Sequence, residues 1–201
     1  MEGMESFKNG TKEFESIYTG THKATDISPF IHQAAIDPHL SIDDLHMLCD
    51  ASLHFNFSGF CTDLTRLAEA RKRLGTSKST KLIAIIAFPF GFIPSNLKKN
   101  EAEWAASQGA DELDLIPNLL ALRENKIDLY GEEIASICER GLPVRVVLNY
   151  NEIRKESISI ATNIALEAGA VGVQNSNGFG PKATANDIIR ISKVVRGRCE
   201  I

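Results

Sequence analysis

The 201-residue sequence lacks any apolar run long enough to cross a membrane. Its longest such run, residues 82–88 with their flanks, falls far short of the roughly 20 residues that a transmembrane helix needs. The chain also opens with acidic and polar residues, where a secretory signal would have an apolar core. We therefore expect a cytoplasmic protein without membrane spans.

Cysteine is scarce, and neither sign of charge is in large excess. The four cysteines, Cys49, Cys61, Cys138 and Cys199, each lie in an apolar segment, and no two have the spacing of metal ligands. They are typical of buried thiols in a reducing compartment. The net charge of −4 comes from interspersed acids and bases, which argues against a surface for nucleic acid or membrane. We expect neither a metal nor a cofactor.

Short apolar segments with strand character recur about every 25 to 32 residues. The clearest of them, residues 81–88, is apolar on both faces, which is typical of a central strand in a parallel sheet. A seventh segment begins at Arg198, just before the chain stops. The six complete predicted strands are residues 31–36, 57–62, 81–88, 112–116, 144–148 and 170–174.

A helical pattern fills each interval between these strands. Ser41 with Asp44, and Thr184 with Asp187, form the pattern of a hydroxyl residue followed three positions later by an acid that starts a helix. Apolar residues at helical spacing predict the remaining helices, four of which end at glycines. In the last helix the predicted buried residues are Ile188, Ile191 and Val194.

Strands and helices that alternate at this spacing form βαβ units and a parallel sheet. A barrel is favoured over a doubly wound sheet because acids and amides follow several strands and no Gly-x-Gly-x-x-Gly follows the first. We predict an α/β fold, a TIM-type (β/α) barrel over residues 27–201, with a polar extension at 1–26. Because a barrel needs eight strands, it would be incomplete at the C-terminus. Either a longer chain or another segment or subunit would then cover the gap.

Three segments in order carry a family resemblance. Residues 86–91 read Ile-Ala-Phe-Pro-Phe-Gly, residues 109–114 read Gly-Ala-Asp-Glu-Leu-Asp, and residues 176–180 read Ser-Asn-Gly-Phe-Gly. From about residue 31 to residue 201, the chain resembles the class I deoxyribose-phosphate aldolases, which are (β/α)8 barrels. The resemblance indicates shared ancestry and a shared fold, whereas activity depends on the individual site residues.

The resemblance implies a particular chemistry. In that family a lysine on the sixth strand forms a Schiff base with the sugar aldehyde, and a neighbouring cation and a dry pocket lower the pKa of its amine. An aspartate on the fourth strand and a second lysine on the seventh move the protons. Backbone amides of the loops after strands six to eight hold the phosphate. The reaction splits 2-deoxyribose 5-phosphate into glyceraldehyde 3-phosphate and acetaldehyde.

The catalytic positions of that family fall on mixed residues here. Asp114 falls on the acid–base aspartate, and Arg145 falls on a lysine of the fifth strand. Gln174 falls on the Schiff-base lysine, and its amide nitrogen cannot add to an aldehyde because the lone pair is delocalised into the carbonyl. The second lysine would lie just past Ile201. Lys182 is the only nearby lysine that would replace the missing nucleophile.

Polar residues at the predicted strand ends would line the mouth of the barrel and suit a small sugar phosphate or polyol. The substrate-binding positions implied by the resemblance are Cys61, Asn118, Asn149, Ser176, Gly178 and Phe179. Cys61 would be a thiol lining the pocket, and the turn at Gly178 and Phe179 would present backbone amides to an anion. His32, placed at the end of the first strand, would reach the same mouth as a hydrogen-bonded structural residue.

Three hypotheses for function follow. The first is an aldolase-like barrel that has lost class I activity and serves as a binding or regulatory module, which Gln174 favours. The second is an active aldolase that uses a substitute lysine such as Lys182. The third is a lyase or isomerase driven by Asp114 without a covalent intermediate. Alternatively, Asp114 has the structural role of pairing with Arg145. The sequence leaves a homo-oligomer open.

Overall fold

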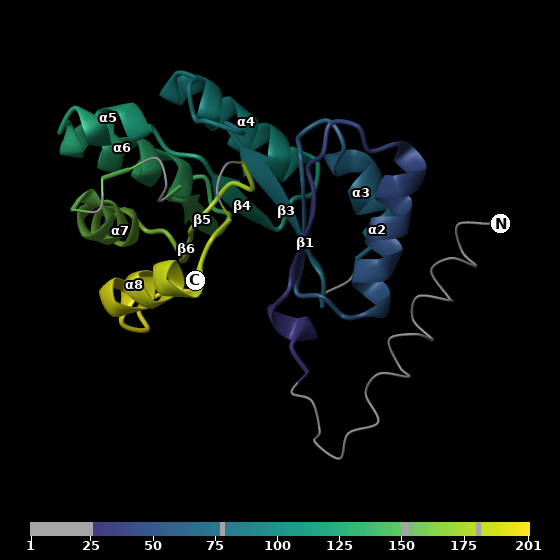
Figure 1. The fold of residues 1–201 in the computed structure, drawn as a ribbon. Helices are drawn as coiled ribbons and strands as arrows, with labels where there is room; N and C mark the ends of the chain where they lie inside the picture. Colours follow the sequence, from purple (N-terminus) through teal and green to yellow (C-terminus); the bar gives the residue numbers. More distant parts are fainter. Residues whose placement is uncertain (1–25, 77–78, 150–152, 155, 180–181) are drawn as a thin grey trace, which may run out of the picture.

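Six parallel strands form one curled sheet in the computed structural model, which describes residues 26–76, 79–149, 153–154, 156–179 and 182–201 (Figure 1). The strands pair in sequence order, and Gly172 also forms a parallel bridge to Glu200. This bridge confirms that a seventh strand begins near Arg198. The strands are β1 His32–Ala35, β2 Gly59–Thr62, β3 Lys81–Ile86, β4 Glu112–Leu115, β5 Val144–Val147 and β6 Gly172–Gln174.

Helices fill every interval between the strands and lie along the outside of the curled sheet (Figure 1). This alternating order, with all strands parallel, confirms an incomplete TIM-type barrel. The predicted extension lies outside the described residues apart from Asp26. The helices are η1 Ser28–Phe30, α2 Ile42–His54, α3 Leu67–Leu74, α4 Ser95–Ser107, α5 Leu119–Arg123, α6 Ile127–Cys138, α7 Ser157–Glu167 and α8 Ala185–Val195.

Both predicted helix starts are confirmed by reciprocal hydrogen bonds. The Ser41 hydroxyl accepts from the Asp44 backbone N–H at 3.1 Å, and an Asp44 carboxylate oxygen accepts from the Ser41 N–H at 2.9 Å. Thr184 and Asp187 form the same pair of contacts at the start of α8. Each pair satisfies backbone donors that the first turn of a helix leaves open.

Three local features differ from the sequence prediction. Strand β3 ends at Ile86, two residues early, because Ala87 has a φ of 59° and its N–H donates to Glu101 Oε2 at 2.7 Å. The short helix α5 was not predicted, although the Asn118 side chain caps it by accepting from the Ala121 N–H at 3.1 Å. The prediction that Ile188 is buried is wrong, since α8 packs through Ile191 and Val195 and leaves Ile188 42 % exposed.

The hydrophobic core lies between the sheet and the helices. Because strand side chains alternate between the two faces, one set points outward under the helices and the other into the barrel. Outward-pointing Phe60, Leu82 and Leu113 are fully buried. The inward set includes charged residues: in the strand register, Glu112 lies beside Ile83 of β3, and Arg145 lies beside Asp114 of β4. The site must therefore be sought on the inward face.

A buried ion pair links β4 to two helices. The Lys98 ammonium of α4 donates to Glu133 Oε1 of α6 at 2.8 Å and to the Ile116 carbonyl oxygen, just past β4, at 3.0 Å. Glu133 Oε1 also accepts from the Asn118 N–H at 2.8 Å. Burial lowers the pKa of Lys98, and the Glu133 carboxylate opposes that shift. The contacts fix where the chain leaves β4.

Replacing Lys98 by methionine is expected to lower the free energy of unfolding by about 3 kcal/mol, because Glu133 would keep a buried charge without its partner. Chemical denaturation measures this change. The matched control is Lys72→Met, because the Lys72 side chain is 79 % exposed and lies 3.8 Å from Glu69. Surface pairs of that kind contribute little to stability. Equal effects of the two substitutions would contradict a structural role for the buried pair.

Candidate functional site

The centre of the inward face is an aspartate held by two neighbouring side chains. Asp114 Oδ1 on β4 accepts from Arg145 Nε on β5 at 2.9 Å, and Asp114 Oδ2 lies 3.7 Å from the Cys61 sulfur on β2. These residues are 4 %, 7 % and 6 % exposed, respectively. The structure therefore brings together three of the predicted site residues, and it places Asp114 in the structural pairing with Arg145 that the sequence left open.

Burial controls the protonation of this centre. It raises the pKa of Asp114, while the Arg145 guanidinium opposes the shift. It also raises the pKa of the Cys61 thiol well above its ordinary value, and the nearby Asp114 carboxylate adds to that effect. Because the thiolate is the nucleophilic form of cysteine, Cys61 is suited to lining a pocket and unsuited to attacking a substrate.

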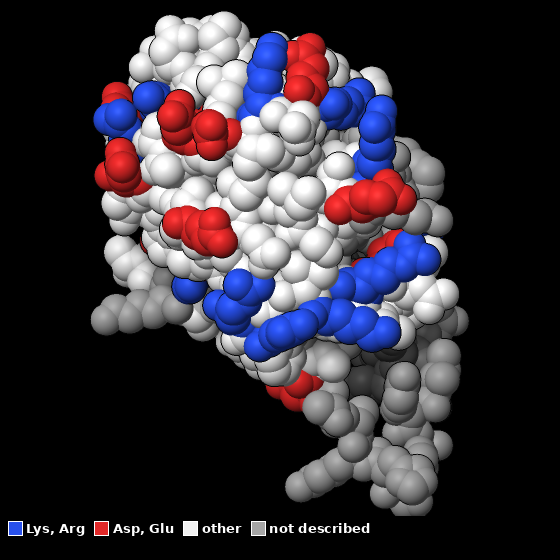
Figure 2. Space-filling model, turned by 90° about the vertical axis from the view of Figure 1, so that its left-hand side faces the viewer, with Lys and Arg blue, Asp and Glu red and all other residues white. Residues whose placement is uncertain are grey.

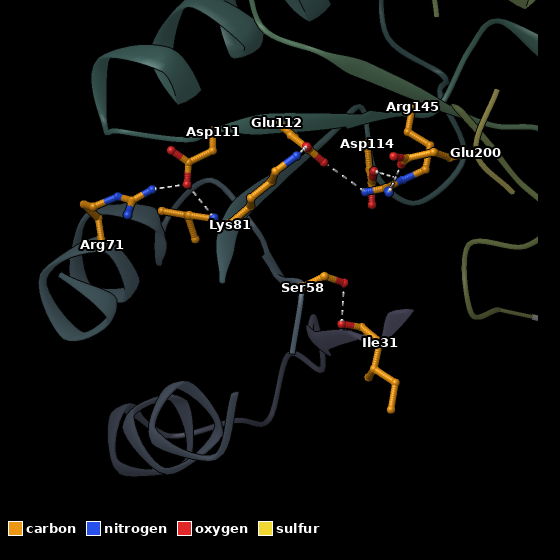
Figure 3. Close-up of polar contacts among 10 residues, drawn as sticks. Ile31, Ser58, Arg71, Lys81, Asp111, Glu112, Asp114, Arg145 and Glu200 are labelled. Carbon is orange, nitrogen blue, oxygen red and sulfur yellow. Dashed lines mark hydrogen bonds and ion pairs between the residues drawn. The ribbon is translucent and has the colours of Figure 1, made fainter. Parts of the chain in front are cut away.

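Arg145 joins a row of charges across the inward face (Figure 3). Besides Asp114, its guanidinium lies 3.7 Å from Glu112 Oε2 and 3.8 Å from Glu200 Oε2. Glu112 in turn pairs with Lys81 at the amino end of β3. Arg145 Nη2 is buried and makes no hydrogen bond within the described part of the chain. One cation is thus shared by three carboxylates, and its nitrogen without a hydrogen bond, Nη2, is the one that faces Glu112.

Glu112, Lys81 and Glu200 were missed by the sequence analysis. Glu112 precedes Asp114 by two residues, and side chains two apart on a strand share a face, so this spacing was an available signal. Glu200 reaches Arg145 because the chain after α8 returns to pair beside β6. No local pattern in the sequence announces that contact.

Gln174 is the last residue of β6 and is half-buried at the carboxyl end of the sheet. Its side-chain Nε2 donates to the Ser176 carbonyl oxygen at 2.6 Å, so the amide is tied to its own loop. The β5–β6 register pairs Gln174 with Val147, just before Asn149. Gln174 and Asn149 were predicted to lie at the ends of neighbouring strands, and the structure places them there.

The loop after β6 uses its own side chains to satisfy its turn. The Gly178 N–H donates to Ser176 Oγ at 3.1 Å, and the Phe179 N–H donates to Asn177 Oδ1 at 2.9 Å. The Asn177 N–H in turn donates to Asn149 Oδ1 at 3.3 Å. An anion bound at this turn would have to replace those acceptors. Gly180, part of the predicted turn, lies outside the described residues.

The remaining predicted residues lie apart from the centre. Asn118 uses its side-chain oxygen to cap α5, and Lys182 is exposed in the segment that leads to α8. His32 is the first residue of β1 and pairs with Gly59, so it lies at the amino end of the strand. The prediction that His32 reaches the mouth is wrong, because His32 begins the strand and the carboxyl end, which faces the mouth, is at Ala35.

Charges of both signs occupy the helical face opposite the inward site. Figure 2 shows them interspersed, with lysine and arginine gathered in the lower part at the height of α8.

Among the residues with described positions, no three histidine, cysteine, aspartate or glutamate side chains could hold a metal ion. No helix in that part of the chain is long and apolar enough to cross a membrane. The expected cytoplasmic location stays a prediction.

Known proteins resemble this chain in sequence. No family model matches it. It is 32 % identical over 176 residues to a deoxyribose-phosphate aldolase of Thermococcus gammatolerans, covering 85 % of this chain and 78 % of that protein. It is also 32 % identical over 177 residues to a deoxyribose-phosphate aldolase of Trichormus variabilis, covering 88 % of this chain and 78 % of the relative.

Solved structures agree with these relatives. An aldolase designated QR15 superposes with a TM-score of 0.82 at 28 % identity, over 88 % of this chain and 80 % of that one. A deoxyribose phosphate aldolase from Aeropyrum pernix, described as having a unique tetrameric structure, gives 0.75 at 22 % identity over 85 % and 73 % of the two chains, which shows the shared fold. From its identity to relatives across most of their length, the chain belongs to the deoxyribose-phosphate aldolase family.

Proposed function

We propose that this protein is a deoxyribose-phosphate-aldolase-like barrel that binds a small sugar phosphate-like or polyol ligand without Schiff-base catalysis, as a binding or regulatory module. The observation that carries this proposal is Gln174 at the carboxyl end of β6. The family resemblance puts the nucleophilic lysine at that position, and an amide cannot form an iminium ion with an aldehyde. Without the iminium ion, the substrate has no electron sink.

The lysines of the described segments offer no evident replacement. Lys81 faces into the barrel but pairs with Glu112 at the amino end of β3. Lys98 is buried between α4, β4 and α6. Lys182 is exposed to solvent in the segment that leads to α8. A Schiff-base lysine needs a dry pocket that releases the neutral amine.

The centre is better suited to binding than to proton abstraction. The Asp114 carboxylate already accepts from Arg145, and that contact holds the negative charge in place. The half-buried side chains of Gln174 and Ser176 supply polar groups for the hydroxyls of a ligand. The names of the relatives support a deoxyribose phosphate as the model ligand. The tetramer described for the Aeropyrum pernix protein supports an oligomer as a further proposal.

One observation favours a second candidate, a lyase or isomerase that acts through Asp114 without a covalent intermediate. Burial raises the pKa of Asp114. A carboxylate with a raised pKa is a stronger base and is characteristic of proton-transfer sites. Turnover of 2-deoxyribose 5-phosphate without a trapped intermediate would support this candidate over a binding module.

Borohydride trapping tests the absence of a Schiff base. We expect no reduced adduct on the protein with 2-deoxyribose 5-phosphate, read as intact mass, because no lysine of the described segments lies in a dry pocket at the carboxyl ends of the strands. The Gln174→Lys variant is expected to be trapped, since it places an amine at the end of β6, on the same face as Arg145, whose charge lowers the pKa of the amine.

The Thermococcus gammatolerans relative, treated in the same way, serves as the positive control for this experiment. An adduct on a single lysine of the unaltered protein would overturn the proposal. Loss of that adduct in Lys182→Arg would identify Lys182 as the substitute nucleophile and establish the active-aldolase hypothesis.

Replacing Asp114 by asparagine is expected to lower the free energy of unfolding by about 1 kcal/mol, because Arg145 would lose one hydrogen-bonded carboxylate but keep Glu112 and Glu200 nearby. Chemical denaturation measures the loss, with the exposed Asp43→Asn as the control. An Asp114→Asn variant as stable as the unaltered protein, but unable to turn over 2-deoxyribose 5-phosphate, would instead assign Asp114 to catalysis.

A further inference from the structure

Four phenylalanines from two loops form a connected cluster. Phe88, Phe90 and Phe92 follow β3, and Phe179 follows β6. The Phe179 ring packs edge-on against Phe88 and Phe90, with centroids 5.4 Å and 6.3 Å away, and Phe90 stacks with Phe92 at 5.8 Å. The four rings make one continuous aromatic surface.

This surface faces solvent to an unusual degree. Phe90 is 45 % exposed, Phe92 77 % and Phe179 47 %. Burying a phenylalanine side chain stabilises a fold, and these exposed rings do not contribute much of that stabilisation. Single exposed apolar residues are ordinary, but adjacent ones often mark a binding surface. Three adjacent exposed rings therefore need an explanation.

Specific contacts hold the rings in place. Asn177 Nδ2 donates to the Pro89 carbonyl oxygen at 2.7 Å and so ties the loop after β6 to the loop after β3. Gly91, with a φ of 72°, fits tightly against the segment after β4, where an added Cβ would lie 2.4 Å from the Pro117 carbonyl oxygen. The two loops are thus seated on the barrel and present the rings outward.

The cluster shares the mouth with the polar site. Both loops leave the carboxyl ends of their strands, and the segment after β6 lies beside the end of β3 (Figure 1). The same loop approaches the end of β1, because a Cβ on Gly178 would lie 3.9 Å from Ile36 Cδ1. Gln174 and Ser176 precede Phe179 by five and three residues. An aromatic surface thus adjoins polar groups.

We infer that the phenylalanine cluster is a stacking surface for an aromatic base, so that the mouth takes a 2-deoxyribose phosphate that still carries its base. This inference rests on the proposed sugar phosphate site. A ring inserted between two others needs roughly 7 Å, twice the 3.5 Å contact distance between carbon atoms. Because Phe90 and Phe92 are 5.8 Å apart, the base would stack on the open face of the cluster.

A small ligand fits this surface better than a protein partner. A stable protein interface covers about 800 Å² on each partner, far more than three partly exposed rings provide. A ligand that joins a flat apolar ring to a hydroxylated, anionic part matches both the rings and the polar side chains. A 2-deoxyribonucleoside monophosphate has this chemistry.

Calorimetric titration with 2-deoxyribose 5-phosphate and thymidine 5′-phosphate tests the inference, because the two ligands differ chiefly by the base. Stacking of a base on an aromatic side chain is worth roughly 1–3 kcal/mol by alanine substitution, so we expect thymidine 5′-phosphate to bind about tenfold tighter. Phe92→Ala should remove most of this advantage and leave the affinity for 2-deoxyribose 5-phosphate unchanged. Phe30→Ala, at an 83 % exposed phenylalanine in η1, should change neither affinity.

The outcomes separate this inference from the proposed function. Equal affinities for the two ligands would overturn the stacking surface and leave the sugar phosphate site standing. An advantage for thymidine 5′-phosphate that survives Phe92→Ala would place the base elsewhere and also overturn the inference. If neither ligand binds, both proposals fail. Conversion of an oligomer to a monomer by Phe92→Ala, seen by light scattering, would identify the cluster as a subunit contact.

Discussion

The arrangement of the inward face depends on one buried guanidinium, that of Arg145. A charge removed from water is tolerated only when partners surround it, and Arg145 has Asp114, Glu112 and Glu200 within ion-pair distance. These partners lie on β4 and on the segment that bridges to β6, so the same contacts connect three neighbouring parts of the sheet. Removing the cation would leave several carboxylates facing one another.

The fixed charge of Arg145 also restricts the chemistry that its neighbours can perform. A lysine at this position could lose its proton when buried, whereas a guanidinium stays charged. It holds Asp114 in a hydrogen-bonded pair, and its Nη2 lies 3.7 Å from Glu112. Gln174 adds an amide whose nitrogen is occupied by the Ser176 carbonyl oxygen. Such groups form hydrogen bonds with hydroxyls, and a carboxylate, a guanidinium and an amide all lack the free amine that a Schiff base needs.

Features set by short-range contacts were predictable from the sequence, and those set by pairing of distant segments were not. The helix starts at Ser41 and Thr184 follow from residues three positions apart. The pairing of Asp114 with Arg145 was among the alternatives because both lie on adjacent predicted strands. In contrast, the approach of Glu200 to Arg145 depends on the return of the chain after α8 to the edge of the sheet. No local pattern in the sequence encodes that return.

Exposure varies across the inward face and shows where a ligand would gain most from binding. His32 and Ala34 on β1 are exposed, whereas Asp114, Arg145 and Cys61 are buried. Electrostatic contacts are stronger where water is excluded, so a ligand hydroxyl would form its strongest hydrogen bonds near β4 and β5. The hydrogen bond between Asn177 and Pro89 joins the loops that follow β6 and β3, the strands that flank β4 and β5 in the sheet. The polar recognition groups and the aromatic rim are therefore held together by the same pair of loops.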